Sequence, residues 1–514
     1  MVRASSILVV AASSAFIAGT RAQPFCQDQD STSWTPCNAS LPIPGASEFE
    51  CAEVTAPLCH KGVCESKQTI KLFVKRLRAT QDADNKPNVW LLAGGPGQAG
   101  TSLFDQDAAT LRDMSEQGAN FYMTDHRGTG RSAPLDCGKK LQPSGYGECF
   151  RKLLAQSDNK PEAFSVTSAA NDVVHLATKF ATNAETYVYG VSYGTYLTER
   201  VIHLAPKIVK GYMLDGVSAD RNNPFTYTSD DMMPVTKRLA EACEGNDFCR
   251  SKFEQDITKH GSLYTAFVEI VNSFDKSSNQ CVDWIMKVQK EESADSEGAA
   301  NATTSPSKAV RRLLGGFILG DQKIFIPAYL YRIKRCNDND MQFVQAFTKS
   351  EDDDIGIAQL LYNVISIRHL YNSTPAFTYK PDQYNEKVAP IPDGVGVIVF
   401  NGGLDFNTPW EYGRRQFDDM KTSNKLMVEA EHGPHGIALS PITPEDESQC
   451  GHQIFLQFVA SKGDVSKVDA SCMKHAPLLQ YDNEQTVARV FKQRLGGDAF
   501  DGTVLPDTTQ EPKI

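Results

Sequence analysis

Short, continuous apolar runs constrain the fold of this chain more than any other feature. In the first half they lie at residues 88–92 (NVWLL), 121–124 (FYMT), 186–189 (TYVY) and 211–214 (GYML). Such runs, bounded by Gly, Asp or Pro, are typical of parallel strands that are buried on both faces of a sheet. Residues 168–180 place apolar side chains at i, i+3, i+4 and i+7, which indicates an intervening helix. Alternation of strand and helix predicts a parallel α/β sheet.

A long polar region interrupts this alternation. Charged, helical segments dominate it, and residues 291–307 form an acidic stretch of low complexity. Apolar runs return at residues 394–400 (GVGVIVF) and 424–430 (NKLMVEA), and a last helical pattern lies around residues 453–459. Before the first parallel strand, residues 67–79 alternate polar and apolar side chains, which indicates a strand of an antiparallel pair.

The N-terminus predicts export. Arg3 precedes an apolar run at residues 7–19, and small residues then lead to Ala22, a pattern typical of a cleaved signal peptide. An uncleaved anchor is the alternative, but no later run reaches the roughly eighteen apolar residues of a membrane span. The expected parts of the chain are a signal peptide (1–22), a first core segment (23–218), a helical cap insertion (219–390), a second core segment (391–475) and a C-terminal tail (476–514).

Cysteine usage agrees with an oxidising compartment. The chain has 13 cysteines, and most should pair outside the cytosol. Close neighbours suggest four local disulfides, namely Cys59 with Cys64, Cys137 with Cys149, Cys243 with Cys249, and Cys450 with Cys472. A zinc site is disfavoured because no C-x-x-C pair occurs, and we expect no metal or other cofactor. Glycosylation sequons lie at Asn38, Asn301 and Asn372.

The charge balance excludes one class of partner. The formal net charge is -11, whereas a nucleic-acid-binding protein needs a concentrated basic surface. An acidic protein is compatible with cationic ligands such as free amines.

A possible nucleophile lies at the end of one predicted parallel strand. Ser192 is the central residue of Gly190-Val191-Ser192-Tyr193-Gly194, a G-x-S-x-G pattern between a strand and a helical segment. This context is that of a nucleophile elbow. The five letters alone also arise by chance, so the remainder of a catalytic machinery is required.

The other members of a triad occur in the order Ser, Asp, His that doubly wound hydrolases use. Asp405 follows the predicted strand 394–400, at the end of the strand where α/β sites lie. The loop after the last predicted strand holds His432 and His435, and we favour His435 as the base because Gly-Pro-His-Gly forms a tight loop.

Two glycine-rich loops follow other strands. Residues 91–100 (LLAGGPGQAG) suit an oxyanion hole, formed by an amide of Gly94 or Gly95 together with the amide of Tyr193. A phosphate-binding loop is excluded because no Lys-Ser/Thr pair follows. Residues 125–132 (DHRGTGRS) are an anion site or, as we favour, a turn that braces the oxyanion loop, with Asp125 and Arg127 in structural roles.

With these motifs the chain resembles secreted α/β-hydrolase peptidases of the prolyl-iminopeptidase and tripeptidyl-aminopeptidase type. The resemblance is carried by AGGPGQAG, DHRGTGRSAPLDC, GVSYGTYL, YMLDGVS, GGLDFNTPW and GPHGI, and it covers residues 51–219 and 390–472. It implies an α/β-hydrolase core with a helical cap, a triad of Ser192, Asp405 and His435, and no cofactor. Ala93 stands where the family commonly has histidine, and the final loop reads His-Gly-Pro-His rather than Gly-x-Gly-His.

The resemblance implies a secreted serine exopeptidase that acts on peptides with a free N-terminus and releases one to three residues. A carboxylesterase or lipase would use the same triad on a different substrate. A non-catalytic, hydrolase-like binding module is the alternative from another class, and it is disfavoured because candidates for all three triad members are present.

Overall fold

The computed structural model describes the two core segments and parts of the region between them. The described residues are 33–37, 49–105, 107–136, 146–218, 229–273, 317–319, 322–324, 382–385, 387–405, 407–439, 449–475, 495–496 and 503–504. The predicted signal peptide and the sequons at Asn38, Asn301 and Asn372 lie outside the described residues, as do most of the predicted cap and tail.

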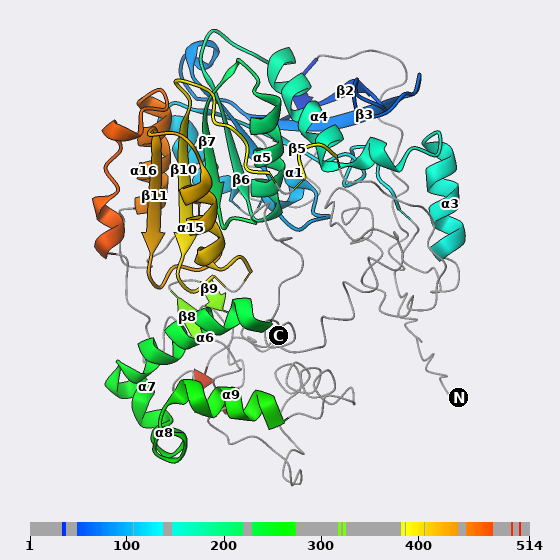
Figure 1. Ribbon diagram of the computed structural model, residues 1–514. Helices are drawn as coiled ribbons and strands as arrows, with labels where there is room; N and C mark the ends of the chain where they lie inside the picture. Colours follow the sequence, from blue (N-terminus) through cyan, green and yellow to red (C-terminus); the bar gives the residue numbers. More distant parts are fainter. Residues whose placement is uncertain are drawn as a thin grey trace, which may run out of the picture.

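A nine-stranded sheet forms the centre of the protein, with the strand order β1-β2-β3-β5-β4-β6-β7-β10-β11 (Figure 1). The strands from β5 to β11 are parallel, whereas β1, β2 and β3 pair antiparallel at one edge. The bounds are β1 (Thr35–Pro36), β2 (Glu50–Pro57), β3 (Thr69–Leu77), β4 (Asn88–Leu92), β5 (Asn120–Thr124), β6 (Thr186–Val191), β7 (Val209–Asp215), β10 (Gly396–Gly402) and β11 (Lys425–Ala430). This order, with the chain crossing back between β4 and β5, is the α/β-hydrolase fold. It confirms the predicted fold class.

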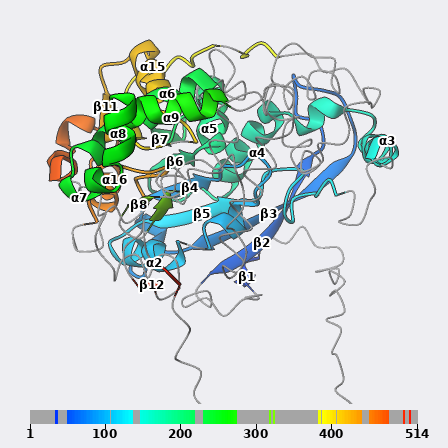
Figure 2. The ribbon, with the colours of Figure 1, turned by 90° about the horizontal axis from the view of Figure 1, so that it is seen from below.

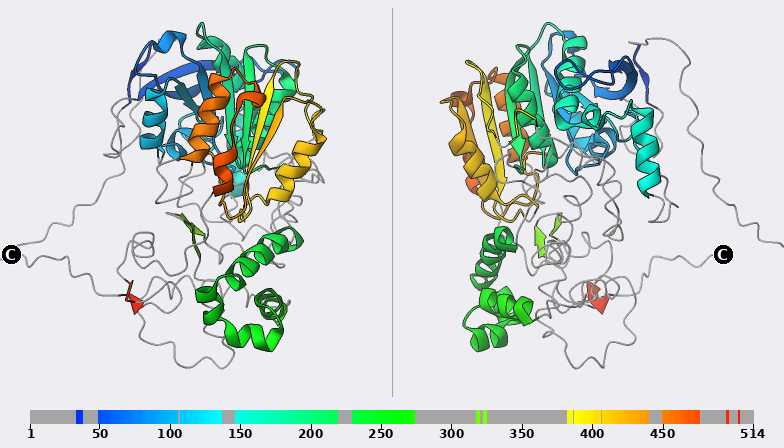
Figure 3. Two further views of the ribbon diagram at one scale, coloured as in Figure 1. Left: turned by 90° about the vertical axis from the view of Figure 1, so that its left-hand side faces the viewer. Right: turned by 45° about the vertical axis from the view of Figure 1, so that its right-hand side comes forward.

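Helices cover both faces of the sheet, as the views in Figures 1 and 3 show. Those of the two core segments are α1 (Gly100–Leu103), α2 (Ala108–Glu116), α3 (Tyr146–Gln156), α4 (Val166–Lys179), α5 (Tyr193–Leu204), α15 (Trp410–Asp419) and α16 (Cys450–Ala460). Short 3-10 helices lie at Ala83–Asn85, Pro161–Phe164, Val465–Lys467 and Ser471–His475. Helix α4 begins before the predicted pattern because the Ser165 side chain caps it, accepting the Ser168 amide.

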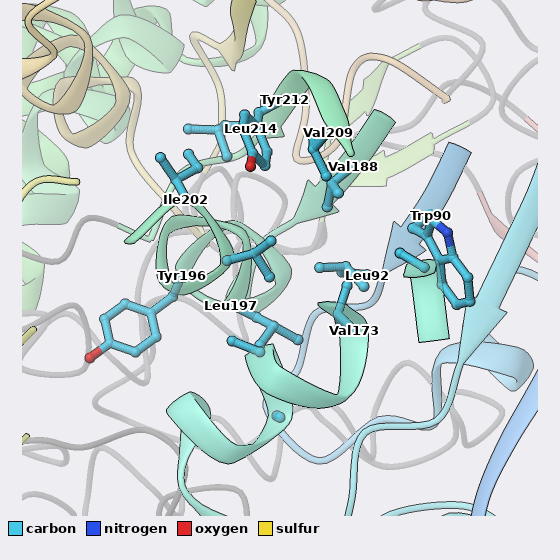
Figure 4. Close-up of a cluster of buried hydrophobic side chains, with 14 of the residues drawn as sticks. Trp90, Leu92, Val173, Val188, Tyr196, Leu197, Ile202, Val209, Tyr212 and Leu214 are labelled. Atoms are coloured by element: carbon cyan, nitrogen blue, oxygen red, sulfur yellow. The ribbon is translucent and has the colours of Figure 1, made fainter. Parts of the chain in front are cut away.

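Side chains that alternate along the strands build a separate core on each face. Val188 points toward α4 and α5, where it joins Trp90, Leu197 and Tyr212 (Figure 4). Its neighbour Tyr187 lies in the opposite core, which includes residues of α2 and α16. Burial on both faces explains why these strands are continuous apolar runs in the sequence.

Between β7 and β10 the described residues contain four helices, α6 (Ser229–Glu244), α7 (Asp247–Lys252), α8 (Glu254–His260) and α9 (Leu263–Ser273). They lie beyond the carboxyl ends of β10 and β11, and Figure 2 shows them in front of the sheet when it is viewed from that side. Two small hairpins, β8–β9 (Phe317–Leu319 and Gln322–Ile324) and β12–β13 (Leu495–Gly496 and Thr503–Val504), complete the described elements.

Four disulfides link described cysteines. Three of them, Cys59–Cys64, Cys243–Cys249 and Cys450–Cys472, are those that close spacing predicted. Cys149 is also disulfide-bonded, and Cys137, its predicted partner, lies outside the described residues. The fourth, Cys37–Cys51, was not predicted; it links the residue after β1 to the antiparallel strand β2 at the sheet edge.

No helix within the described ranges has both the length and the apolar composition of a membrane span. Within the same ranges, His, Cys, Asp and Glu side chains form no cluster suited to a metal ion.

Candidate active site

Ser192 occupies a strained turn between β6 and α5. Its φ of 58° and ψ of -127° lie in a region that residues with a side chain rarely adopt. The Ser192 amide donates to the Asp215 carbonyl at 2.9 Å. Gly190 allows the turn to be this tight, because a Cβ there would lie 2.2 Å from the Gly194 carbonyl oxygen. The serine therefore has the backbone geometry of a nucleophile elbow.

Helix α5 begins directly after the serine, at Tyr193. Its first free amides and its dipole place partial positive charge beside the Ser192 hydroxyl. The helix is almost completely buried, so this field is poorly screened by water.

Asp405 lies in the loop after β10 and is completely buried. One carboxylate oxygen, Oδ1, accepts the amides of Asn407 and Thr408, both at 2.8 Å. The other, Oδ2, accepts the Thr408 hydroxyl at 2.7 Å and lies 2.7 Å from Nδ1 of His435. The loop thus fixes the carboxylate with one oxygen directed at the imidazole.

His435 is the histidine that the fold brings to Asp405. Because the carboxylate only accepts hydrogen bonds, Nδ1 carries the proton, and Nε2 of the neutral ring keeps a lone pair for a proton from a nucleophile. The side chain of His435 is 23% exposed. His432 is half-buried, and this burial lowers its pKa.

The histidine loop and the elbow lie at the same edge of the sheet. The His435 ring packs on Gly216, where a Cβ would lie 2.8 Å from Nδ1. Gly216 directly follows Asp215, the residue whose carbonyl accepts the Ser192 amide. The next residue after His435 also approaches the elbow, because the Cβ position of Gly436 lies 3.5 Å from Cγ2 of Val191. The three predicted triad residues are therefore brought together at the carboxyl ends of β6, β7 and β10.

Asp215 is a site residue that the sequence reasoning missed. Its buried carboxylate accepts the amides of Ile437 and Ala438, at 3.0 and 2.7 Å, and the Tyr189 hydroxyl at 2.9 Å. Burial raises the pKa of Asp215 to about 6, against the opposing effect of these hydrogen bonds. Through this one residue the histidine loop is tied to the strand that precedes Ser192. The only sequence signal is an acid at the end of an apolar strand, in YMLDGVS.

The predicted oxyanion loop lies against the nucleophile. A Cβ at Gly94 would be 2.7 Å from the Ser192 Cβ and 3.2 Å from its Oγ, so only glycine fits there. Gly95 follows with a φ of +116°. The structure therefore places Gly94 beside Ser192, with Gly95 next in the chain and Tyr193 at the first turn of α5.

The DHRGTGRS turn braces this loop in the way the sequence suggested. Asp125 accepts the Thr101 amide at 2.9 Å and the Thr101 hydroxyl at 2.7 Å, which fixes helix α1 behind the oxyanion loop. The same carboxylate accepts the Arg131 amide at 2.9 Å. The buried Asp125 side chain thus bonds both to another residue of its own turn and to helix α1 at the end of the oxyanion loop.

His126 in this turn reaches the elbow and was also missed. Burial lowers the pKa of His126 to about 4, so the ring is neutral near pH 7. Its Nδ1 lies 2.7 Å from the Arg127 carbonyl and must donate, which leaves Nε2 to accept the Tyr193 hydroxyl at 2.9 Å. His126 therefore fixes the side chain of Tyr193, the residue that follows Ser192.

Arg127 does not form an anion site. Its guanidinium is buried and makes a bidentate pair with Asp172, with both contacts at 2.6 Å. It also donates to the carbonyls of Leu58 and Ala163, at 2.6 and 2.5 Å. Burial alone would raise the pKa of Asp172, but Arg127 and His60 outweigh it and hold that pKa below its usual value. Arg127 is consequently structural, as predicted.

The chain has only distant similarity to known proteins. No protein-family model and no curated protein sequence matches the chain. Similar solved structures include alpha/beta hydrolase domain-containing protein 10 from mouse, at 11% identity and a TM-score of 0.31 over 77% of this chain and 96% of that one. The proline iminopeptidase from Mycobacterium smegmatis aligns at 12% identity with a TM-score of 0.33, over 77% of this chain and 96% of that one. An esterase from Exiguobacterium antarcticum aligns at 14% identity with a TM-score of 0.31, again over 77% of this chain and 96% of that one. The fold assignment rests on the strand order and elbow of this chain itself.

Proposed function

We propose that the protein is a secreted serine exopeptidase that cleaves peptides near a free N-terminus and releases one to three residues. The observation that supports a hydrolase most directly is the contact of 2.7 Å between buried Asp405 and His435 Nδ1. This pair lies at the sheet edge where Ser192 occupies its strained turn. Together they form the acid, base and nucleophile of acyl transfer.

The proposed reaction follows from these positions. Nε2 of His435 takes the proton as Ser192 Oγ attacks the scissile carbonyl, and Asp405 stabilises the imidazolium. The Tyr193 amide and a glycine amide of the loop beside it stabilise the oxyanion. The imidazolium then gives its proton to the leaving amine, and the acyl-enzyme forms. Water, deprotonated by His435, releases the acyl group and regenerates the serine.

Support for a peptidase comes from the sequence motifs and from the position of the intervening helices. The AGGPG and DHRGTGRS motifs resemble those of the prolyl-iminopeptidase and tripeptidyl-aminopeptidase group. Helices α6 to α9 lie beyond the carboxyl ends of the strands (Figure 1), where a cap would limit access to the ends of peptides. Secretion is supported by the apolar N-terminal run and by the disulfides.

The test compares a chromogenic tripeptide amide with a free α-amine and the same compound acetylated, with Ser192→Ala as the control. We expect hydrolysis of the free form only, and loss of that activity in the variant. Equal cleavage of both forms would refute amine recognition, and cleavage of neither with turnover of short-chain esters would replace the peptidase with a carboxylesterase.

A further inference from the structure

Arg238 connects the helices after β7 to the loop that carries Asp405. It lies on α6, and its side chain is 19% exposed. Nε donates to the Gly403 carbonyl at 2.7 Å, and Nη1 donates to Glu411 Oε1 at 2.6 Å. These two acceptors stand before and after Asp405 in the chain, so one guanidinium bridges the two ends of the segment 403–411, which is called the acid loop below.

The segment around Gly403, to which Arg238 donates, is itself hydrogen-bonded to the histidine loop. The Gly403 amide donates to the Ala430 carbonyl at 2.8 Å, and the Leu404 amide donates to the Gly433 carbonyl at 2.9 Å. Gly403 and Leu404 immediately precede Asp405, and Gly433 lies shortly before His435. A shift of Gly403 would therefore move the acid and the base relative to Ser192.

Trp410 makes the contact rigid. The guanidinium of Arg238 lies 4.4 Å from the centre of the indole, and that of Arg414 lies 3.8 Å from it. The indole N–H donates to Glu411 at 3.0 Å, which directs that carboxylate toward Arg238. Stacking and a planar fork with two acceptors are properties of arginine that lysine does not share.

We propose that Arg238 is a positioning residue that couples the seating of α6 on the core to the alignment of the Asp405–His435 pair. The proposal rests on the proposed hydrolase function of that pair. When α6 packs on the core, Arg238 fixes the acid loop through Gly403 and Glu411, and His435 is oriented for proton transfer. When α6 moves away, Gly403 and Glu411 lose the donors that Arg238 supplies, and the serine loses an aligned base.

A purely structural anchor would behave differently from a positioning residue. If Arg238 only attached α6, its loss would change the access of large substrates and would raise KM without changing kcat. If it positions the acid and base, its loss lowers kcat, since displacements of about 1 Å at a catalytic group can cost about 100-fold. The reaction of Ser192 with a small fluorophosphonate also needs the base, but it needs no peptide binding.

The test uses the full chain and three variants, Arg238→Gln, Arg238→Lys and Arg414→Gln. Arg414 is the matched control, because it stacks on the same Trp410, but its guanidinium donates to Glu429 on β11, at 2.7 and 2.9 Å, instead of to Gly403 and Glu411. Fluorophosphonate labelling rates and the pH dependence of labelling are measured, with thermal denaturation as the check of folding.

We expect Arg238→Gln to label about 10- to 100-fold more slowly, Arg238→Lys to fall between it and the wild type, and Arg414→Gln to stay within about twofold. The acidic limb of the Arg238→Gln profile should move to lower pH, because a loosened carboxylate stabilises the imidazolium less. Unchanged labelling in Arg238→Gln, or an equal loss in Arg414→Gln, would overturn the proposal. If Arg238→Gln does not fold, full labelling by folded Arg238→Lys overturns it instead. A wild type that never labels would instead refute the hydrolase itself.

Discussion

Asp405→Asn separates the electrostatic role of the acid from its role in building the loop. Oδ1 of Asp405 accepts two backbone amides, those of Asn407 and Thr408, both at 2.8 Å. An asparagine must place its oxygen there, because the reverse orientation would set its NH2 group against both donors. The NH2 group consequently faces Nδ1 of His435, where Oδ2 now lies at 2.7 Å.

This forced orientation reverses the hydrogen bond to the base. The amide donates to Nδ1, so the ring proton moves to Nε2, and His435 has no lone pair for the proton of Ser192. The equivalent change in a Ser-His-Asp protease lowers kcat about 10,000-fold. We expect a loss of about 1,000- to 10,000-fold here, which corresponds to about 4–5 kcal/mol of transition-state stabilisation. The loop keeps both backbone bonds, so the free energy of unfolding should fall by only about 1–2 kcal/mol.

The assay is the labelling rate of Ser192 with a fluorophosphonate, together with urea denaturation of the same samples. Asp405→Ala is the companion variant, since it removes the two amide acceptors as well and should be both inactive and clearly less stable. A folded Asp405→Asn protein that keeps more than about a tenth of the wild-type rate would refute the reasoning. It would move the role of the acid to another carboxylate, with Asp215 the first to be tested.

Three further outcomes are expected. His435→Ala should lose at least about 1,000-fold in activity, whereas His432→Ala should keep at least half, and the reverse result would exchange their roles. Gly94→Ala should slow Ser192 labelling about 100-fold, because the new Cβ would lie 2.7 Å from the Ser192 Cβ. An unchanged rate would show that the loop moves away from Ser192 without loss of function. The raised pKa of Asp215, about 6 in the fold against 3.8 in the unfolded chain, gives stability that is complete below pH 3.8 and lost as pH rises through 6. Asp215→Asn removes this component, so in urea denaturation the free energy of unfolding of the variant should rise relative to that of the wild type between pH 3.8 and about 6, and a constant difference would contradict the assignment.

The parallel strands of the core were predictable because burial on both faces leaves a direct trace in the sequence. β4 spans Asn88–Leu92, the range that its apolar run predicted, and β10 and β11 were predicted within two residues at each end. The strand β2 (Glu50–Pro57) was not predicted. From Ala52 to Ala56 its side chains alternate between buried and half-buried positions, and polar residues break the apolar run that marks the central strands.

The triad candidates were predictable for a related reason. Each of them lies in the turn or loop after a parallel strand, namely β6, β10 or β11, and parallel strands bring their carboxyl ends to one edge of the sheet. Asp215 also ends a parallel strand, but the roles of Asp215 and Arg238 were not predictable, because they depend on partners far along the chain. Asp215 binds an amide 222 positions away, and Arg238 binds a carboxylate 173 positions away. Only the folded chain shows these pairings.

Asp215 and Asp405 show why the position of a residue alone does not assign its role. Both carboxylates are completely buried at the carboxyl end of neighbouring strands, β7 and β10, and both lie close to the histidine loop. Their donors distinguish them. Asp215 accepts two loop amides and a phenol, so it fixes the backbone whether or not a proton is in transit. Asp405 alone accepts from a side chain that gains and loses charge, the imidazole of His435. The Asp405 carboxylate accepts the hydrogen bond from Nδ1 of His435, so it both orients the ring and stabilises the imidazolium. This direct contact makes Asp405 the proposed acid, whereas Asp215 holds the loop that carries the base.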